Sequence, residues 1–511
     1  MLSDNMMFRI FAVIGSILLM IGVPVLLFVP SFISRTFKQM DYLGKDSNGT
    51  LNEITQSWQK PKYDMGVSFT VYNVENELLI FSSGAQPILK EIGPFHFDEH
   101  MVKKNLKWLE NDTKVEYENV RYYNFNQDKS CTNCTLEDVV TIPSVVYQKI
   151  LEYANHRGLR SIVEMVFNAK GITPFIKVKV GEALFDGYKD PILQAVCEST
   201  LLSKVCSLFK IDEKIGFYYQ KNGTADGVYQ IDTGYGNRDD ISKIYAWNHM
   251  LGKLNDTFWW GDEARRIYET DGQMFPSDVD QNKRINMFTG QACRTLFFDF
   301  ARKSEHEGVS AFIYNPSKSM MDMNVQKRMG FCNPDTPRYF NSTSVQLDGC
   351  PPNGLMDVSS CVPGAPKVFI SQPHFLNAPE EVRKVFAGIK EPSESEDNTL
   401  LEIEPDTGVL IHAEARTQMN LGMDNSVFSF TSKQPNLVFP IFYVKESINF
   451  DKETRDKLHH GINFFKSWAY IISIALIFMG AVTWTFAICS YYKAQDQLLR
   501  NEEAVSLSQF S

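Results

Sequence analysis

The sequence has little basic charge to offer a polyanion. It contains 51 Lys and Arg against 61 Asp and Glu, which gives a formal net charge of −10 at pH 7. Proteins that bind nucleic acid neutralise phosphates with clustered basic side chains, and this sequence carries no such cluster. It also lacks a repeat of fixed period, which argues against a solenoid. We therefore expect neither a nucleic-acid-binding protein nor a repeat array.

Common catalytic motifs are missing as well: there is no Walker A loop, no Gly-x-Ser-x-Gly elbow and no His-Glu-x-x-His pair. Asp232-Thr-Gly and Asp406-Thr-Gly match the paired motifs of aspartic proteases, whose two carboxylates share one proton. Each lies in a polar, turn-rich context and not at the end of a buried strand. His96 and His100 lie in a stretch that alternates like a strand, so we interpret them as surface histidines. We expect no catalytic residue, no metal and no cofactor.

Charged residues are absent from two long apolar runs, 10–33 and 467–492. Each run exceeds the roughly 20 residues that a helix needs to cross about 30 Å of hydrocarbon. The first is too long for a signal-peptide core and no small-residue cleavage site follows it, so we expect a retained span. Basic residues flank both ends of both runs, and the positive-inside rule does not decide the orientation. Cys489, near the end of the second run, is a candidate for S-palmitoylation; the alternative is an inert membrane thiol.

Glycosylation sequons indicate the orientation. Six Asn-x-Ser/Thr sequons lie between the two runs and none lies in either tail. They begin at Asn48, Asn111, Asn133, Asn222, Asn255 and Asn341. Eight of the nine cysteines also lie there, and an even number in an oxidising compartment suggests disulfides. We predict cytosolic tails, 1–9 and 493–511, and a glycosylated extracellular or lumenal region, 34–466.

Short β-rich stretches predict an antiparallel sheet or barrel. They include 67–72, 78–81, 367–371 and 408–412. Between 142 and 209 the apolar periodicity becomes helical, with candidate helices after Pro143, over 162–167 and after Pro191. Segment 388–399 is typical of an acidic surface loop. The predicted fold class is α+β: a β core with a helical insertion, and not a parallel α/β sheet.

Several segments occur in a fixed order between the spans. They are Glu91-Ile-Gly-Pro-Phe-His-Phe, Gly187-Tyr-Lys-Asp-Pro191, Thr224-Ala-Asp-Gly-Val-Tyr229, Thr270-Asp-Gly-Gln-Met-Phe-Pro276, Gly349-Cys-Pro-Pro-Asn-Gly-Leu-Met-Asp-Val-Ser-Ser-Cys361, Ser371-Gln-Pro-His-Phe-Leu-Asn-Ala378 and Leu401-Glu-Ile-Glu-Pro-Asp-Thr-Gly408. With both spans, this set resembles the class B scavenger receptor family. That family includes the fatty acid translocase, the high-density lipoprotein receptor, the lysosomal integral membrane protein and the insect sensory neuron membrane proteins.

The resemblance implies one large ectodomain, an antiparallel β-barrel with a helical bundle at its membrane-distal apex and a lipid-conducting tunnel toward the bilayer. The bundle corresponds to 142–209. The resemblance also implies two disulfides, Cys293 with Cys361 and Cys332 with Cys350. The remaining cysteines would then form local pairs, Cys197 with Cys206 and Cys131 with Cys134.

In family members a lysine-bearing stretch after the second apical helix receives acidic ligands. The nearest residue here is Lys170, which follows a stripe that includes Ile162, Val166 and Phe167. In the functional interpretation this stripe frames a tunnel entrance and Lys170 attracts an acidic headgroup. In the alternative the stripe packs against neighbouring helices and Lys170 is solvated.

We therefore expect a non-enzymatic receptor of the plasma membrane that binds long-chain fatty acids, phospholipids, sterols, lipoproteins or anionic particles and passes lipid to the membrane. The alternative is a lysosomal or endosomal membrane protein that carries a lumenal hydrolase or exports lipid, although Leu498-Leu499 lacks the acidic residue of a dileucine signal. An ecto-enzyme such as an ecto-nucleotidase would need Asp-x-Gly-Ser phosphate loops, and a two-span channel would need polar residues in its spans. The sequence does not name the oligomeric state.

The predicted topology is open to direct test. An epitope tag on either terminus should be out of reach of antibody on intact cells and become accessible after permeabilisation. Glycosidase digestion should lower the apparent mass in several steps, because six sequons face the lumen or the outside. A terminal tag that antibody reaches on intact cells would contradict this topology.

Overall fold

The computed structural model describes residues 4–198, 214–267, 269–361, 365–424, 436–460 and 462–509. They form two compact units. The terminal unit consists of Met1–Asp41 and Lys452–Ser511, and the ectodomain unit is Tyr42–Asp451. The ectodomain unit is shorter than the expected 34–466 because the terminal helices continue beyond the apolar runs.

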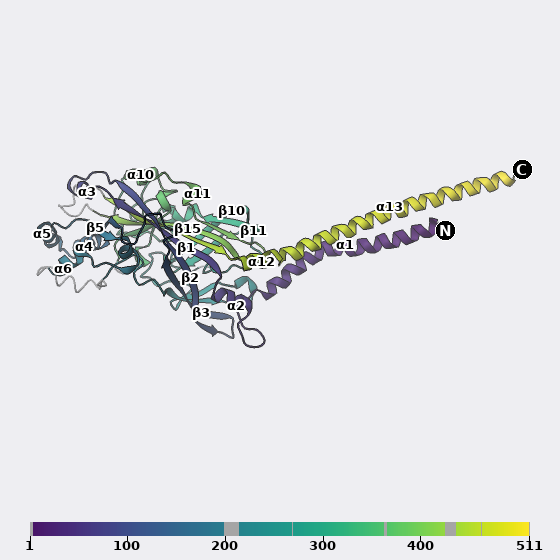
Figure 1. The fold of residues 1–511 in the computed structure, drawn as a ribbon, viewed down its shortest axis with the longest axis horizontal. Helices are drawn as coiled ribbons and strands as arrows, with labels where there is room; N and C mark the ends of the chain where they lie inside the picture. The colour runs from purple at the N-terminus through teal and green to yellow at the C-terminus, as the bar shows by residue number, and fades with distance from the viewer. Residues whose placement is uncertain are drawn as a thin grey trace. The chain divides into compact units, whose positions relative to one another are not determined.

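The terminal unit contains two long helices, α1 (Asp4–Met40) and α13 (Ile462–Gln509), which lie side by side (Figure 1). A short helix, α12 (Lys452–His460), precedes α13. Both long helices are long and apolar enough to cross a membrane. The predicted runs fall inside them.

Glycines let the two long helices pack closely. A Cβ added to Gly15 would lie 2.7 Å from Trp484 Cδ1 and 3.1 Å from the carbonyl oxygen of Gly480. A Cβ on Gly22 would lie 3.1 Å from the Cβ of Leu476. Lipid tails give helices no hydrophobic reason to associate, so close backbone approach through small residues is a common basis of pairing in a membrane.

The ectodomain unit contains short helices besides its sheet. They are α2 (Glu53–Gln59), α3 (Glu77–Ser83), α4 (Val145–His156), α5 (Arg160–Lys170), a π-helical turn (Glu182–Asp186), α6 (Pro191–Cys197), α8 (Lys318–Met321), α9 (Met323–Met329), α10 (Glu380–Lys384) and α11 (Glu394–Asp397), with 3-10 turns at Arg238–Asp240, Ser359–Cys361 and Pro373–Phe375. Helices α4, α5 and α6 gather at one end of this unit, and α2 lies at the other (Figure 1).

A large antiparallel sheet forms the body of the ectodomain unit. Its strands are β1 (Tyr63–Val74), β2 (Leu89–Leu109), β3 (Lys114–Phe125), β6 (Thr224–Asp232), β7 (Ile244–Trp247), β8 (Met250–Leu251), β9 (Ile285–Thr289), β10 (Arg294–His306), β11 (Val309–Pro316), β12 (Met356–Asp357), β13 (Val368–Ser371), β14 (Leu400–Ile403), β15 (Leu410–Met423) and β16 (Leu437–Phe450). The strand order is β8-β7-β6-β3-β2-β1-β16-β15-β14-β11-β10-β9, and β13 joins β12 to β15. The predicted combination of helices with a large antiparallel sheet is confirmed.

Strand β9, at one end of this order, and β7, next to β8 at the other end, pair with the same short segment. The amide of Ile244 in β7 donates to the carbonyl oxygen of Glu269 at 2.7 Å. Thr270 donates to Asn286 of β9 at 3.3 Å and accepts from Phe288 of β9 at 3.0 Å. Residues 269–270 therefore connect β7 to β9 by backbone hydrogen bonds.

The structure has helices at all three positions predicted from apolar periodicity. Helix α4 begins after the cap Ser144, whose hydroxyl accepts from the amide of Tyr147, and α6 begins after the cap Asp190. Helix α5 ends at Gly171, which has a φ of 61°. A separate two-stranded sheet, β4 (Val139–Pro143) and β5 (Phe175–Lys179), lies in the same insertion.

Two local predictions were wrong. Residues 78–81, predicted as a strand, lie in α3, which has Glu77 in its first turn and closes at Gly84 with a φ of 68°. A four-residue apolar run has no periodicity to separate strand from helix. Segment 388–399 is not uniformly a surface loop, because Asp397 ends α11 with only 1% of its surface exposed.

Three disulfides are present in the described part of the chain: Cys293 with Cys361, Cys332 with Cys350 and Cys131 with Cys134. The first two are the pairs that the resemblance implied. Cys206 lies outside the described residues, so its pairing with Cys197 stays a prediction. Cys489 is an exposed free thiol on α13.

The Gly15–Gly480 contact predicts a specific effect of side-chain size. Gly480→Leu should force α1 and α13 apart, whereas Ala481→Leu, on the exposed neighbouring position, should not. Cysteines placed at Phe8 and Tyr491, whose rings lie 5.3 Å apart, report the pairing through a bis-maleimide cross-link in a Cys489→Ala background. The linked fragments are scored after cleavage at a protease site inserted at the exposed 282–283 turn. Equal cross-linking in both variants would contradict the prediction.

Candidate ligand-binding site

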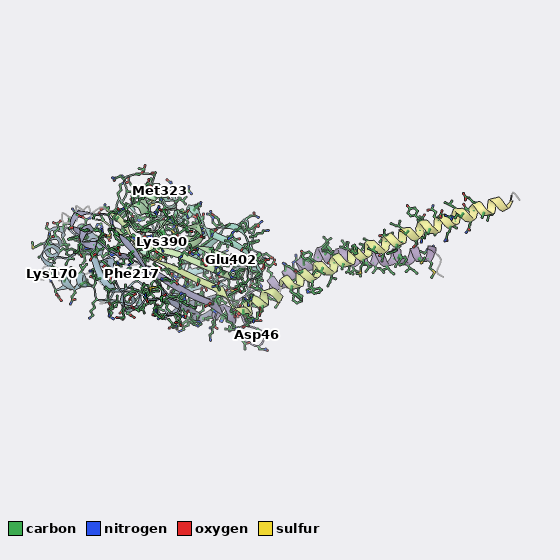
Figure 2. The ribbon with its side chains drawn as sticks, turned by 45° about the horizontal axis from the view of Figure 1, so that its top comes forward. Asp46, Lys170, Phe217, Met323, Lys390 and Glu402 are labelled. Atoms are coloured by element: carbon green, nitrogen blue, oxygen red, sulfur yellow. A yellow bond between two sulfur atoms is a disulfide. The ribbon has the colours of Figure 1, made fainter. Side chains whose placement is uncertain are left out.

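The predicted site residues lie on α5. Val166 and Phe167 are buried and Ile162 is partly buried, so the apolar stripe packs into the helical insertion. The ring of Phe167 lies 5.3 Å from that of Tyr147 on α4. Lys170 is exposed at the last turn of α5, at the helical end of the ectodomain unit (Figure 2). The structure thus separates the apolar stripe, which packs against α4, from the lysine, which faces solvent.

A cavity of about 350 Å³ lies in the same insertion and was not predicted. It is lined by Ile176, Lys177, Val178, Glu182, Gly187, Tyr188, Lys189, Pro191 and Lys214. Lys177 pairs with Glu77 of α3 at 3.3 Å, and Lys214 donates to the carbonyl oxygen of Asp186 at 3.3 Å. The segment 187–191, one of the family-like motifs, supplies much of its wall. That motif was the available signal, but the lysines come from three separate segments.

An aromatic cluster connects this insertion to the sheet. Phe185 of the π-helical turn lies 4.7 Å from Phe97 of β2 and 5.4 Å from Tyr218, measured between ring centroids. Tyr218 also lies 5.0 Å from Phe69 of β1, and Phe217 lies 4.8 Å from Phe442 of β16. Aromatic pairs at these distances add to the burial of their surfaces.

Beyond the aromatic cluster is an ionic cluster formed by Glu99, Arg121 and Glu446. Arg121 Nη1 donates to Glu99 Oε1 at 2.9 Å and to Glu446 Oε1 at 2.6 Å. Arg121 is on β3 and Glu446 on β16, with β2 and β1 between them. In a flat sheet three strand steps span about 14 Å. The contact therefore requires these four strands to curve, with the ionic cluster on the concave face.

The ionic cluster is partly exposed. The side chains of Arg121 and Glu446 keep 22% and 23% of their surface accessible. The Glu99 side chain is fully buried, and its Oε2 has no hydrogen-bond partner among the described residues. Burial and the neighbouring Glu446 raise the pKa of Glu99 to about 7, although Arg121 acts in the opposite direction.

A second ionic cluster, formed by Glu91, His374, Lys390 and Asp397, lies on the other face of the sheet. His374 Nε2 lies 3.1 Å from Glu91 Oε1 and its Nδ1 lies 2.9 Å from Asp397 Oδ2. Lys390 also pairs with Glu91. The Tyr443 hydroxyl reaches Glu91 at 3.3 Å, and Tyr443 points away from the concave face because it is three residues from Glu446. Glu91 and His374 come from two of the family-like motifs, which are thus joined by an ion pair.

Opposing effects set the pKa values of this outer cluster. Burial raises the pKa of Glu91, but hydrogen bonds from His374 and Lys390 lower it to about 2. Burial lowers the pKa of His374, but the bonds to Asp397 and Glu91 outweigh it, so the pKa is raised.

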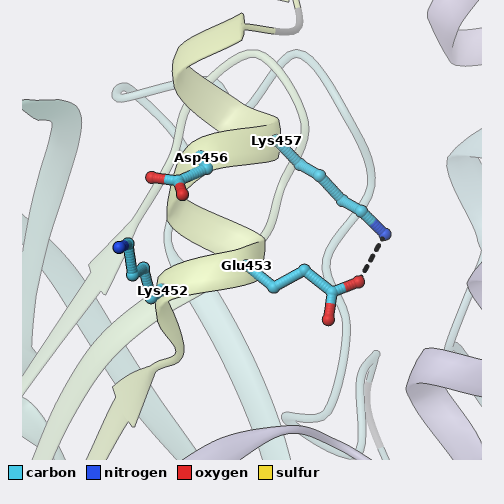
Figure 3. A pocket seen from close by; sticks show the side chains of 4 residues that line it. All are labelled: Lys452, Glu453, Asp456 and Lys457. Carbon is cyan, nitrogen blue, oxygen red and sulfur yellow. Dashed lines mark ion pairs between the residues drawn. The ribbon is translucent and has the colours of Figure 1, made fainter.

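One further hollow lies on α12 in the terminal unit (Figure 3). It is lined by Lys452, Glu453, Asp456 and Lys457, and Lys457 Nζ lies 3.2 Å from Glu453 Oε1. The four side chains come from successive turns of one helix, and their charges cancel. This hollow offers no selective site.

With this geometry in view, the chain was compared with known proteins. A profile of the CD36 family matches residues 13–491. The chain belongs to the CD36 family. It is 30% identical to lysosome membrane protein 2 of Rattus norvegicus over 463 residues, which cover 89% of this chain and 90% of the relative. It is 26% identical to sensory neuron membrane protein 1 of Pediculus humanus subsp. corporis over 476 residues, which cover 89% of this chain and 87% of the relative.

Membership of the CD36 family confirms the resemblance to class B scavenger receptors. It also agrees with the two terminal apolar helices, and the protein is a membrane protein. The six sequon asparagines are all exposed in the ectodomain unit, as attachment of a glycan requires. Membership of the family does not identify the residues that bind a ligand in this chain. These are inferred from the geometry described above.

The outer cluster predicts how stability depends on pH. The contribution of His374 is complete below its unfolded pKa of about 6.5 and is lost as pH rises through the raised folded value. The contribution of Glu91 is complete above about pH 4.3 and is lost as pH falls toward about 2. His374→Gln should therefore lower the free energy of unfolding by about 3–5 kcal/mol near pH 5.5, and by less near pH 8.5.

Thermal or denaturant unfolding of the full-length glycoprotein in detergent at both pH values measures this effect. His100→Gln is the matched control, because His100 is an exposed histidine on the same strand as Glu91. A loss of stability that is the same at both pH values would contradict the assignment.

Proposed function

We propose that this protein is a membrane receptor that captures lipid or anionic lipid particles at the helical end of its ectodomain and passes lipid to the membrane. The observation that carries the proposal is that the helical insertion has both an exposed Lys170 and a lysine-lined cavity. The aromatic cluster joins this insertion to the concave face of the sheet. Membership of the CD36 family supports the same function.

We also infer that the sheet acts as a barrel around a lipid path. The pairing of residues 269–270 with both β7 and β9 supports closure, and the Arg121–Glu446 contact supports the curvature. Moving a lipid chain into water costs about 0.8 kcal/mol of free energy per methylene, so a long chain faces a barrier on the order of 10 kcal/mol. An enclosed apolar path lowers that barrier without an energy source.

The helical insertion would be the apex of this barrel. It lies at the end of the ectodomain unit opposite α2, and α2 begins 13 residues after the last residue of α1. The ligands proposed are long-chain fatty acids, phospholipids, sterols, lipoproteins and anionic particles, and the role proposed is that of a receptor and not of an enzyme.

The cellular location has two candidates. The Leu498-Leu499 pair in the C-terminal tail lacks the acidic residue of a dileucine signal, which favours the plasma membrane. The relatives named lysosome membrane protein 2 favour residence in lysosomes. Surface biotinylation combined with lysosomal fractionation of cells that express the tagged chain separates the two. A lysosomal majority would favour the second candidate, in which the protein exports lipid or carries a hydrolase.

Reversal of one charge tests the capture site. Lys170→Glu should reduce binding of phosphatidylserine vesicles and of free oleate, most strongly at low salt, where an exposed charge acts over a longer range. Folding should be nearly unaffected, because surface substitutions usually cost under about 0.5 kcal/mol. Lys318→Glu, an exposed lysine on α8, is the matched control.

Phe167→Ala separates packing from capture. Its ring is 1% exposed, so its removal should lower the free energy of unfolding by about 3–5 kcal/mol. If Lys170→Glu reaches the cell surface at normal levels and binds both ligands as the wild type does, Lys170 has no part in capture.

A further inference from the structure

Strand β5 borders the cavity of the helical insertion with its edge. Three successive residues of the strand, Ile176, Lys177 and Val178, line this cavity. Side chains of successive strand residues point to opposite faces. Here Ile176 and Val178 are buried, whereas the side chain of Lys177 is 67% exposed. Neighbours that point to opposite faces share one space along their backbone, so the cavity lies against the edge of β5.

The hydrogen-bond pattern shows that this edge is free at Lys177. Strands β4 and β5 form a two-stranded sheet, in which Lys177 lies opposite Thr141. The amide of Thr141 donates to Asn73 Oδ1 at 2.8 Å and not to Lys177. Opposite residues of an antiparallel pair either exchange both hydrogen bonds or point their amides and carbonyls away from each other. The amide and carbonyl of Lys177 therefore point away from β4, toward the cavity, and have no backbone partner among the described residues.

Positive charge surrounds this free edge. The cavity is lined by Lys177, Lys189 and Lys214, against one acidic residue, Glu182. Lys177 pairs with a glutamate of α3, but Lys214 donates to a backbone carbonyl oxygen, which does not neutralise its charge. A ligand that satisfies both the edge and the lysines needs hydrogen-bonding groups of a peptide and negative charge.

We propose that the free edge of β5 is a docking site for an extended acidic segment of a partner protein, which adds to β4 and β5 as a third strand. Such a segment supplies amides and carbonyls to the edge and carboxylates to the lysines. A lipid carboxylate only accepts hydrogen bonds, so it has nothing to donate to the carbonyl of Lys177. The proposal goes beyond lipid transfer and does not depend on it.

The cavity sets the length of the enclosed segment. Its volume of about 350 Å³ is at the small end of binding pockets. Only a few residues of the partner would be enclosed, and the rest of the segment would continue over the surface. A short peptide is therefore an adequate probe.

Two N-methylated forms of one peptide test the hydrogen bonds. The probe is fluorescein-labelled Val-Glu-Val-Glu-Val-Glu-Val, and fluorescence polarisation measures its binding to the full-length protein in phosphatidylcholine nanodiscs. Only every second residue of an added strand bonds to the edge that it joins. One form carries N-methyl groups on the two inner valines and the other on two glutamates. Binding should weaken by about tenfold or more in one form and by about twofold or less in the other.

Variants of the protein test the edge and the charge. Lys177→Pro removes the free amide, which takes no part in the pairing with β4, and should weaken binding of the unmodified probe by about tenfold or more. Lys177→Ala keeps the amide and should weaken it by about threefold or less. Lys214→Glu should weaken binding most strongly at low salt, whereas Lys318→Glu, on the exposed face of α8, should bind the probe as the wild type does.

The methylated probes keep the test decisive if Lys177→Pro does not fold, because they are measured on the wild type. Equal binding of the two methylated forms, whether both bind or neither does, overturns the edge as a docking site. Failure of the unmodified probe to bind also overturns it, since lysines on a sheet edge can serve to keep other strands away. If that probe fails while Lys214→Glu weakens binding of phosphatidylserine vesicles, the cavity takes lipid and not peptide. Each of these outcomes leaves the proposed lipid transfer intact.

Discussion

Pairing between the first and last strands of the ectodomain unit is the contact on which the rest of the sheet depends. Tyr63, at the start of β1, lies opposite Phe450, at the end of β16. The strands on one side of this pair come from the first half of the chain, and those on the other side from the second half. Bringing β1 and β16 together closes a loop of several hundred residues. The entropy lost on closing this loop grows only slowly with loop length, but it must be offset before most of the core forms.

The two ionic clusters lie on opposite faces of the strands nearest this pair, and they differ in the balance of positive and negative charge. The outer one surrounds an imidazole with two carboxylates and adds Lys390, so its charges compensate and the loops that carry His374 and Asp397 are held to β2. The inner one places one guanidinium between two carboxyl groups and leaves Glu99 Oε2 without a hydrogen-bond partner among the described residues. The first arrangement suits a structural contact. The second is costly, because a buried carboxyl oxygen is left without a hydrogen bond.

Local signals in the sequence were sufficient for the spans and for the helical insertion. An uncharged apolar run and a stripe such as Ile162–Phe167 on α5 are both defined by neighbours in the sequence, so their structure follows from periodicity. The wrong predictions concern segments whose structure is not determined by neighbouring residues in the sequence. Segment 78–81 is too short to show a period, and Asp397 turns inward because it pairs with a histidine from another loop.

The candidate site depended on contacts that no local pattern reveals. Arg121 and Glu446 are 325 positions apart, and their contact follows from strand order, register and curvature together. The lysines of the cavity come from β5, from the turn before α6 and from beyond it. Lys170 could be singled out only by resemblance. The sequence alone therefore indicated the region of the site, but not the side chains that give it its charge.

The backbone pairing of residues 269–270 bears on how the sheet can associate with neighbouring molecules in a crowded membrane. An open sheet edge exposes backbone amides and carbonyls that can bind a strand of a neighbouring molecule, and membrane proteins confined to two dimensions meet one another often. Because Glu269 and Thr270 form hydrogen bonds with β7 and β9, the backbone groups that make these bonds are not available for such an encounter. Two residues thus satisfy backbone groups on both strands that another molecule could otherwise bind.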